Sequence, residues 1–135
     1  MSRDGRIEIE WPDERRPFRL GIAELEELQE RTGAGPAEVL RRLYHGTWKI
    51  AEVREPLLLG LIGGGMSAAD ALKLGHRYAG PGHLMDAVVP SMSVIYATLN
   101  GAPDEPVGNG AAEETETTVS PKAGSPSPRS TAPAQ

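Results

Sequence analysis

Hydrophobic and polar residues alternate twice near the start of the chain, which predicts two short β-strands. Each run places apolar side chains on one face of an extended segment: Ile7, Ile9 and Trp11 within residues 6–11, and Phe18 and Leu20 within residues 16–20. The intervening Pro12-Asp13-Glu14-Arg15 has the composition of a turn. The pattern therefore predicts a β-hairpin, whose apolar face needs a cover of helices because a lone hairpin is only marginally stable in water.

From residue 22 onward, apolar residues recur at spacings of three and four, which predicts a series of helices. The expected helices cover about 22–31, 36–45, 47–62, 67–78 and 83–99. Their buried faces are expected to include Ile22, Leu28, Val39, Tyr44, Val53, Leu57, Val88, Tyr96 and Leu99.

Glycine, proline and small polar residues mark the expected ends of these helices. Gly33 and Gly46 are suitable stops for the first two helices. Thr47 is a suitable N-cap for the third, and Ser67 begins a capping sequence for the fourth. Pro56 falls inside the third helix, so we expect it either to kink that helix or to divide it into two.

The composition divides the 135 residues into two parts. Beyond residue 101 the only large apolar residues are Val107 and Val119, and a segment so poor in apolar surface is expected to be disordered. The predicted organisation is a folded domain over 1–101, and a Pro/Ser/Thr/Glu tail over 102–135. The fold class is α+β and mostly α, with the hairpin packed on about five short helices. The sequence does not decide whether the tail is a linker, a partner-binding segment or a spacer.

Charge and hydropathy exclude several classes of partner. The formal net charge is −5 and no basic stripe is present, so we expect no nucleic-acid binding. The longest apolar run, residues 57–62, is far shorter than a membrane helix, and no secretory signal is visible. The sequence predicts a soluble intracellular protein.

Candidate chemistry is weak throughout the chain. His45, His76 and His83 do not follow a metal-ligand spacing, and the chain has no cysteine. The glycines at 63–65 follow no strand and precede no phosphate-binding lysine, which favours a simple connection between helices. We therefore expect no cofactor, no metal and no enzymatic activity.

The apolar run at 57–62 is wider than a single helical stripe, and two interpretations are open. It predicts a fully buried central helix, or a helix that is partly exposed and docks a partner. The hypothesis for partner binding is a groove flanked by the third and last helices. Its candidate residues are Leu57, Leu58, Leu61, Ile62, Met92, Ile95 and Tyr96.

Several short motifs occur in a definite order between Arg6 and Gly101. They are Ile7-Glu8-Ile9, Phe18-Arg19-Leu20, Ala23-Glu24-Leu25-Glu26-Glu27, Thr47-Trp48-Lys49-Ile50-Ala51-Glu52-Val53, Gly63-Gly64-Gly65, Ser67-Ala68-Ala69-Asp70-Ala71 and Leu99-Asn100-Gly101. In this order they resemble the small tail assembly chaperones of long-tailed phages, prophages and alphaproteobacterial gene transfer agents.

The resemblance implies a non-enzymatic role in the bacterial host cytoplasm. Such chaperones bind the tape-measure protein, keep it soluble and recruit tail tube subunits, and they are generally absent from the finished particle. The expected partners are therefore the tape-measure and tail tube proteins, and self-association into a homo-oligomer stays open.

Two alternatives from other classes also fit the sequence. The chain could be a structural virion component, such as a minor tail or tube-associated protein. It could instead be a small regulatory protein-interaction module unrelated to phage.

Overall fold

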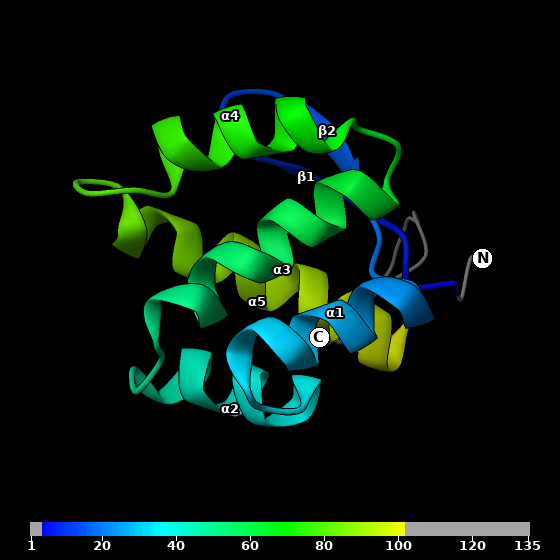
Figure 1. The fold of residues 1–135 in the computed structure, drawn as a ribbon, viewed down its shortest axis with the longest axis vertical. Coiled ribbons are helices and arrows are strands. Elements are labelled where there is room, and N and C mark those ends of the chain that lie inside the picture. The colour runs from blue at the N-terminus through cyan, green and yellow to red at the C-terminus, as the bar shows by residue number, and fades with distance from the viewer. Residues whose placement is uncertain (1–3, 102–135) are drawn as a thin grey trace, which may run out of the picture. The chain divides into compact units, whose positions relative to one another are not determined.

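The computed structural model describes residues 4–101, which form an antiparallel hairpin followed by five helices (Figure 1). The elements are β1 (Ile7–Glu10), β2 (Arg15–Phe18), α1 (Ile22–Thr32), α2 (Pro36–His45), α3 (Ile50–Gly63), α4 (Ala68–Tyr78) and α5 (Leu84–Asn100). The predicted α+β, mostly helical fold class is confirmed. The predicted tail, 102–135, lies outside the described residues.

The hairpin pairs Ile7 with Phe18 and Glu10 with Arg15. Trp11 and Phe18 are buried on its inner side, with their rings edge to face and centroids 6.4 Å apart. The backbone N–H of Trp11 donates to the carbonyl of Glu14 at 3.1 Å, which closes the turn. The alternating pattern thus predicted both the hairpin and its apolar face.

Helix α3 lies at the centre of this unit and contacts the other four helices and strand β2 (Figure 1). Every residue from Pro56 to Leu61 is buried, which confirms the interpretation of the wide apolar run as a central helix. Burial on all sides follows from these neighbours, because each covers a different part of the helix surface.

Helix α3 is continuous through Pro56, so of the two predicted alternatives, a kink or a division, the division is wrong. Proline has no N–H to donate to the carbonyl four residues earlier, which is that of Glu52. The Ser91 hydroxyl of α5 approaches this carbonyl instead, with its Oγ 3.5 Å from the oxygen. This long hydrogen bond gives the freed acceptor a donor from the neighbouring helix.

The glycines at the end of α3 allow the hairpin to approach the helix backbone closely. The N–H of Arg19 donates to the carbonyl of Gly60 at 2.9 Å. A Cβ on Gly63 would overlap the carbonyl oxygen of Arg19, and one on Gly64 would overlap that of Pro17. The glycine run, interpreted from sequence as a simple connection, is therefore also the surface on which the hairpin packs.

Most predicted helix ends are confirmed. Gly33 and Gly46 adopt positive φ angles of 72° and 79° at the ends of α1 and α2. Ser67 Oγ accepts from the N–H of Asp70 at 3.1 Å at the start of α4. Thr47 is not the cap of α3, because that helix starts at Ile50.

Several apolar residues predicted to be buried are exposed. Ile22 and Tyr44 are 72% and 74% exposed, whereas Leu28 and Val39 in the same helices are fully buried. Tyr44 lies about 100–140° around α2 from its buried residues, Val39 and Leu43, at 100° per residue. It therefore points away from the core although it continues an apolar spacing. Tyr96 and Leu99 of α5 are exposed as well, and they belong to the surface described next.

Candidate partner-binding surface

Four of the seven candidate partner-binding residues are buried in the core: Leu57, Leu58, Leu61 and Ile95. Leu58 lies against α4, where its side chain occupies the space that a Cβ on Gly75 would need. The other three belong to the main apolar cluster of the domain. A partner would reach them only if this core opened, so the accessible candidates are the half-buried Ile62 and Met92 and the exposed Tyr96.

Helix α5 carries a row of accessible apolar side chains along its whole length. We call this row the α5 stripe, and it consists of Met85, Val89, Met92, Tyr96 and Leu99. Its members are separated by four, three, four and three residues, the spacing that keeps side chains on one narrow face of a helix. Met85, Val89, Tyr96 and Leu99 are 73%, 68%, 56% and 42% exposed, and Met92 is half-buried.

The opposite side of α5 packs into the domain. Its buried residues are Ala87, Val88, Ser91, Val94, Ile95 and Ala97. At 100° per residue, the centre of the α5 stripe lies roughly 140° around the helix from the centre of this set. The helix therefore presents two apolar sides, one in contact with α2 and α3 and one in solvent.

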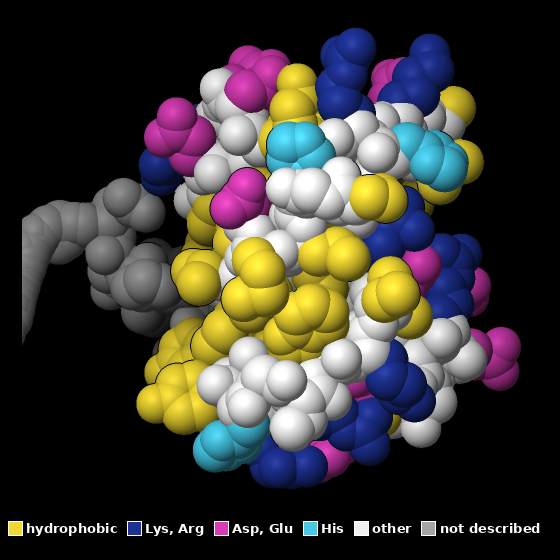
Figure 2. Space-filling view, turned by 90° about the vertical axis from the view of Figure 1, so that its left-hand side faces the viewer, with side chains coloured by type: hydrophobic (Ala, Val, Ile, Leu, Met, Phe, Trp, Pro, Cys, Tyr) yellow, Lys and Arg dark blue, Asp and Glu magenta, His cyan; other side chains and the backbone are white. Residues whose placement is uncertain are grey.

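The remaining exposed apolar residues do not form a comparable row. Among the described residues they are Ile22, Tyr44, Ile50 and Leu72, and each lies on a different helix. Single exposed apolar side chains are ordinary on protein surfaces, whereas a contiguous set is typical of an interaction site. Figure 2 shows hydrophobic side chains gathered across the face on which α3 and α5 begin, between charged groups on either side.

The far end of α5 is fixed to the hairpin. Thr98 Oγ1 donates to the carbonyl of Leu20 at 2.6 Å, which joins positions 78 residues apart in the sequence. The backbone of Gly5 lies against the same threonine, because a Cβ there would be 3.0 Å from its Oγ1. Contacts on its buried side thus hold the helix while the α5 stripe stays accessible.

A buried carboxylate holds the helices next to α5 together. Glu52 is fully buried, and its Oε1 accepts from the backbone N–H of Lys49 at 2.7 Å, at the start of α3. Its Oε2 accepts from Arg42 Nη1 of α2 at 2.5 Å. The hydrogen bond from Arg42 to Glu52, and to a smaller extent its hydrogen bond to Glu38, raises the pKa of Arg42 above its usual value. The pKa of Glu38 is lowered to about 2, chiefly by its hydrogen bonds to Arg41 and then to Arg42.

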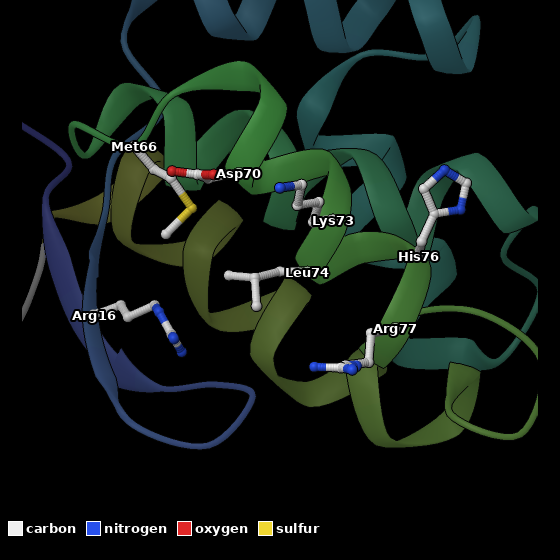
Figure 3. A pocket seen from close by; sticks show the side chains of 7 residues that line it. All are labelled: Arg16, Met66, Asp70, Lys73, Leu74, His76 and Arg77. Carbon is white, nitrogen blue, oxygen red and sulfur yellow. The ribbon is translucent and has the colours of Figure 1, made fainter.

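A second surface feature lies between α4 and the hairpin (Figure 3). We call it the α4–hairpin groove; its volume is about 770 Å³, and it is lined by Arg16, Met66, Asp70, Lys73, Leu74, His76 and Arg77. In Figure 3 the side chains of Arg16 and Arg77 extend toward each other on either side of Leu74, while His76 points away. The groove therefore combines an apolar floor with cationic sides.

The three histidines lie apart on the surface, all of them exposed. Among residues 4–101, no group of three His, Cys, Asp or Glu side chains is placed to hold a metal ion. No helix in this range is both long enough and apolar enough to cross a membrane.

The comparison with protein families decides the class of protein. Residues 4–101 match the family model described as phage tail tube protein, GTA-gp10, where GTA denotes a gene transfer agent. The chain belongs to this family. Neither a curated protein nor a solved structure matches the chain significantly.

Membership in the phage tail tube protein, GTA-gp10 family confirms the predicted relation to phage and gene transfer agent tails. It supports a structural, non-enzymatic role in the tail and does not favour a regulatory module unrelated to phage. The family description does not specify a chaperone, so that finer assignment stays a prediction.

Sequence analysis found only part of the exposed surface. It named Met92 and Tyr96 as candidates, but it omitted Met85 and Val89 and placed Leu99 in the core. The alternating spacing of four and three residues from Met85 to Leu99 is the signal that would have identified the α5 stripe. The α4–hairpin groove was missed because no local pattern connects Arg16 with residues of α4.

Proposed function

We propose that this tail protein is an assembly chaperone that binds a helical segment of the tape-measure protein along the α5 stripe. The observation that supports the proposal is the exposed apolar row on α5, with its coiled-coil spacing. A tape-measure protein is expected to be a long helix with apolar faces, which would aggregate before the tail tube encloses it. A protein that covers such a face would keep it soluble.

The dimensions of the α5 stripe suit a helical partner. From Met85 to Leu99 it extends about 21 Å, at 1.5 Å per residue, which corresponds to about two heptads. Asp86 is the only charged residue of α5, so a helix packed along the stripe would bury few charges. A partner with apolar residues at the same spacing would pack against it as in a helix-in-groove complex.

The proposal also covers where the protein acts and its second partner, the tail tube protein. The protein would act in the host cytoplasm, bring tail tube subunits to the bound tape-measure protein, and leave before the particle is complete. The structural, non-enzymatic character of the family agrees with this role.

The test is co-expression of the full chain with the tape-measure protein expected to be encoded near it, followed by affinity purification and size exclusion. We expect a soluble complex with the wild-type chain, and aggregation of the tape-measure protein when it is expressed alone. The double variant V89E/Y96E should lose the complex, because it places two charges on the α5 stripe. Its melting temperature should stay close to that of the wild type, since both side chains are exposed.

The matched control is the double variant I22E/L72E, which introduces the same charges at exposed apolar positions of α1 and α4. It should bind the tape-measure protein as the wild type does. If V89E/Y96E also binds normally, the α5 stripe is not the binding surface. If the wild-type chain does not bind and the tape-measure protein is soluble by itself, the chaperone function is wrong.

A tube-associated structural protein is the second candidate function. The family, phage tail tube protein, GTA-gp10, supports this role. Immunoblotting of purified particles distinguishes the two candidates. A stoichiometric amount in finished particles would support the structural role, whereas its absence, together with binding before assembly, would support the chaperone.

A further inference from the structure

We infer that the α4–hairpin groove is a second docking site, which binds an acidic, partly apolar peptide segment of a partner protein. Met66 and Leu74 form a half-buried apolar floor. Arg16, Lys73 and Arg77 supply cationic groups around it, and Asp70 is the single carboxylate in the lining. Apolar contacts would anchor the peptide, and the guanidinium and ammonium groups would select for carboxylates.

The cationic groups have hydrogen-bond donors to offer. Within the described part of the chain, neither Lys73 nor Arg77 forms a salt bridge. Arg16 is held by Nη1 bonds to the Trp11 carbonyl at 3.1 Å and to Asp13 at 3.0 Å, and by an Nη2 bond to Glu14 at 2.8 Å. Two carboxylates thus balance the charge of Arg16, so Lys73 and Arg77 are the cationic groups that a ligand would meet.

The cationic groups of the groove stand on a domain whose net charge is negative. Residues 4–101 contain 11 Lys and Arg residues against 14 Asp and Glu residues. A nucleic acid would be repelled by this acidic excess, whereas a short acidic peptide meets the cationic groups locally. The apolar floor also favours a peptide, because phosphate backbones have no apolar side chains to place on it.

The groove and the α5 stripe are formed by different residues. Helix α5 lies behind the groove, between α4 and the hairpin, but no residue of the stripe is among those that line it (Figure 3). This inference does not depend on the proposed function, and the variants below separate the two.

The experiment is fluorescence anisotropy with the full chain and a labelled peptide in which pairs of glutamates alternate with leucines. We expect saturable binding that weakens at higher salt, and at least about tenfold weaker binding by K73E/R77E, since this variant replaces two cationic hydrogen-bond donors by carboxylates. The control R6E/R41E makes the same change in net charge outside the groove and should bind as the wild type does. The variant K73E/R77E should melt close to the wild-type temperature, whereas the control loses the exposed Arg41–Glu38 ion pair and should melt somewhat lower while staying folded.

Several results would overturn the inference. The site does not exist if the wild type fails to bind the peptide, or if K73E/R77E binds it as tightly as the wild type does. The site does not select carboxylates if a peptide with Gln in place of Glu binds as tightly. Displacement of the peptide by single-stranded DNA would show that the groove prefers a nucleic acid. The stripe variant V89E/Y96E should still bind the peptide, and K73E/R77E should still keep the tape-measure protein soluble. The failure of either proposal is thus visible separately from the failure of the other.

Discussion

Replacing Glu52 by Gln tests whether the buried carboxylate holds α2 and α3 together. The wild-type side chain is fully buried and accepts two hydrogen bonds, from the Lys49 N–H at 2.7 Å and from Arg42 Nη1 at 2.5 Å. A glutamine can keep only one of these bonds with its oxygen. Its NH₂ group would then face the other donor, so one bond is lost and two donors oppose each other.

The expected loss in the free energy of unfolding follows from how strongly Glu52 and Arg42 depend on each other. A lost hydrogen bond between charged groups costs about 1.5–3 kcal/mol, and breaking a fully buried ion pair costs about 3–5 kcal/mol. The Arg42 side chain is 27% exposed and also bonds Glu38 at 2.9 Å, so it can turn partly to solvent and keep one partner. We therefore expect E52Q to lower the free energy of unfolding by about 2–3 kcal/mol.

The assay is urea unfolding at neutral pH, followed by far-UV circular dichroism. The control is E27Q, which removes an exposed pair between Glu27 and Arg31 on α1 and should cost less than about 0.5 kcal/mol. If E52Q costs no more than E27Q, the buried carboxylate does not hold α2 and α3 together. A change in the slope of the transition would indicate loss of two-state unfolding instead.

Two further predictions concern the hairpin interface and α2. G63A should destabilise the domain by about 2 kcal/mol or more in urea unfolding, because its Cβ would overlap the carbonyl of Arg19. G35A, with its nearest contact at 3.9 Å, should cost less, and equal losses would contradict the close approach. The lowered pKa of Glu38 means that its ionised form stabilises the fold above its ordinary pKa of 4.5, and that this contribution is lost as the pH falls through about 2. The melting temperatures of wild type and E38Q should differ at neutral pH and converge toward pH 2; a constant difference would refute the assignment.

Local patterns predicted the elements of this fold well. The hairpin follows from alternation around a turn, and Gly33 and Gly46 end helices because each reaches a positive φ angle without strain. The burial of α3 followed from an apolar run too wide for one stripe. The hairpin and the helix ends depend on a few neighbouring residues, so the sequence alone was sufficient for them, whereas the structure was needed to choose burial of α3 over a partly exposed docking helix.

The surfaces were harder to predict because they depend on how elements pack. Helix α5 has apolar residues on two sides, and its sequence does not say that Ile95 meets the core while Tyr96 meets solvent. The effect of Pro56 was also nonlocal, since Ser91 approaches the freed carbonyl of Glu52 from another helix. The groove brings Arg16 next to α4 across more than 50 residues of sequence.

The central place of α3 has a consequence for how long the protein's binding capacity persists. Because this helix contacts all four other helices and strand β2, no loop divides residues 4–101 into halves with cores of their own. A single proteolytic cut that exposed α3 would release α4 and α5 together, and with them both proposed surfaces. The lifetime of both proposed surfaces would then depend on one cooperative opening event.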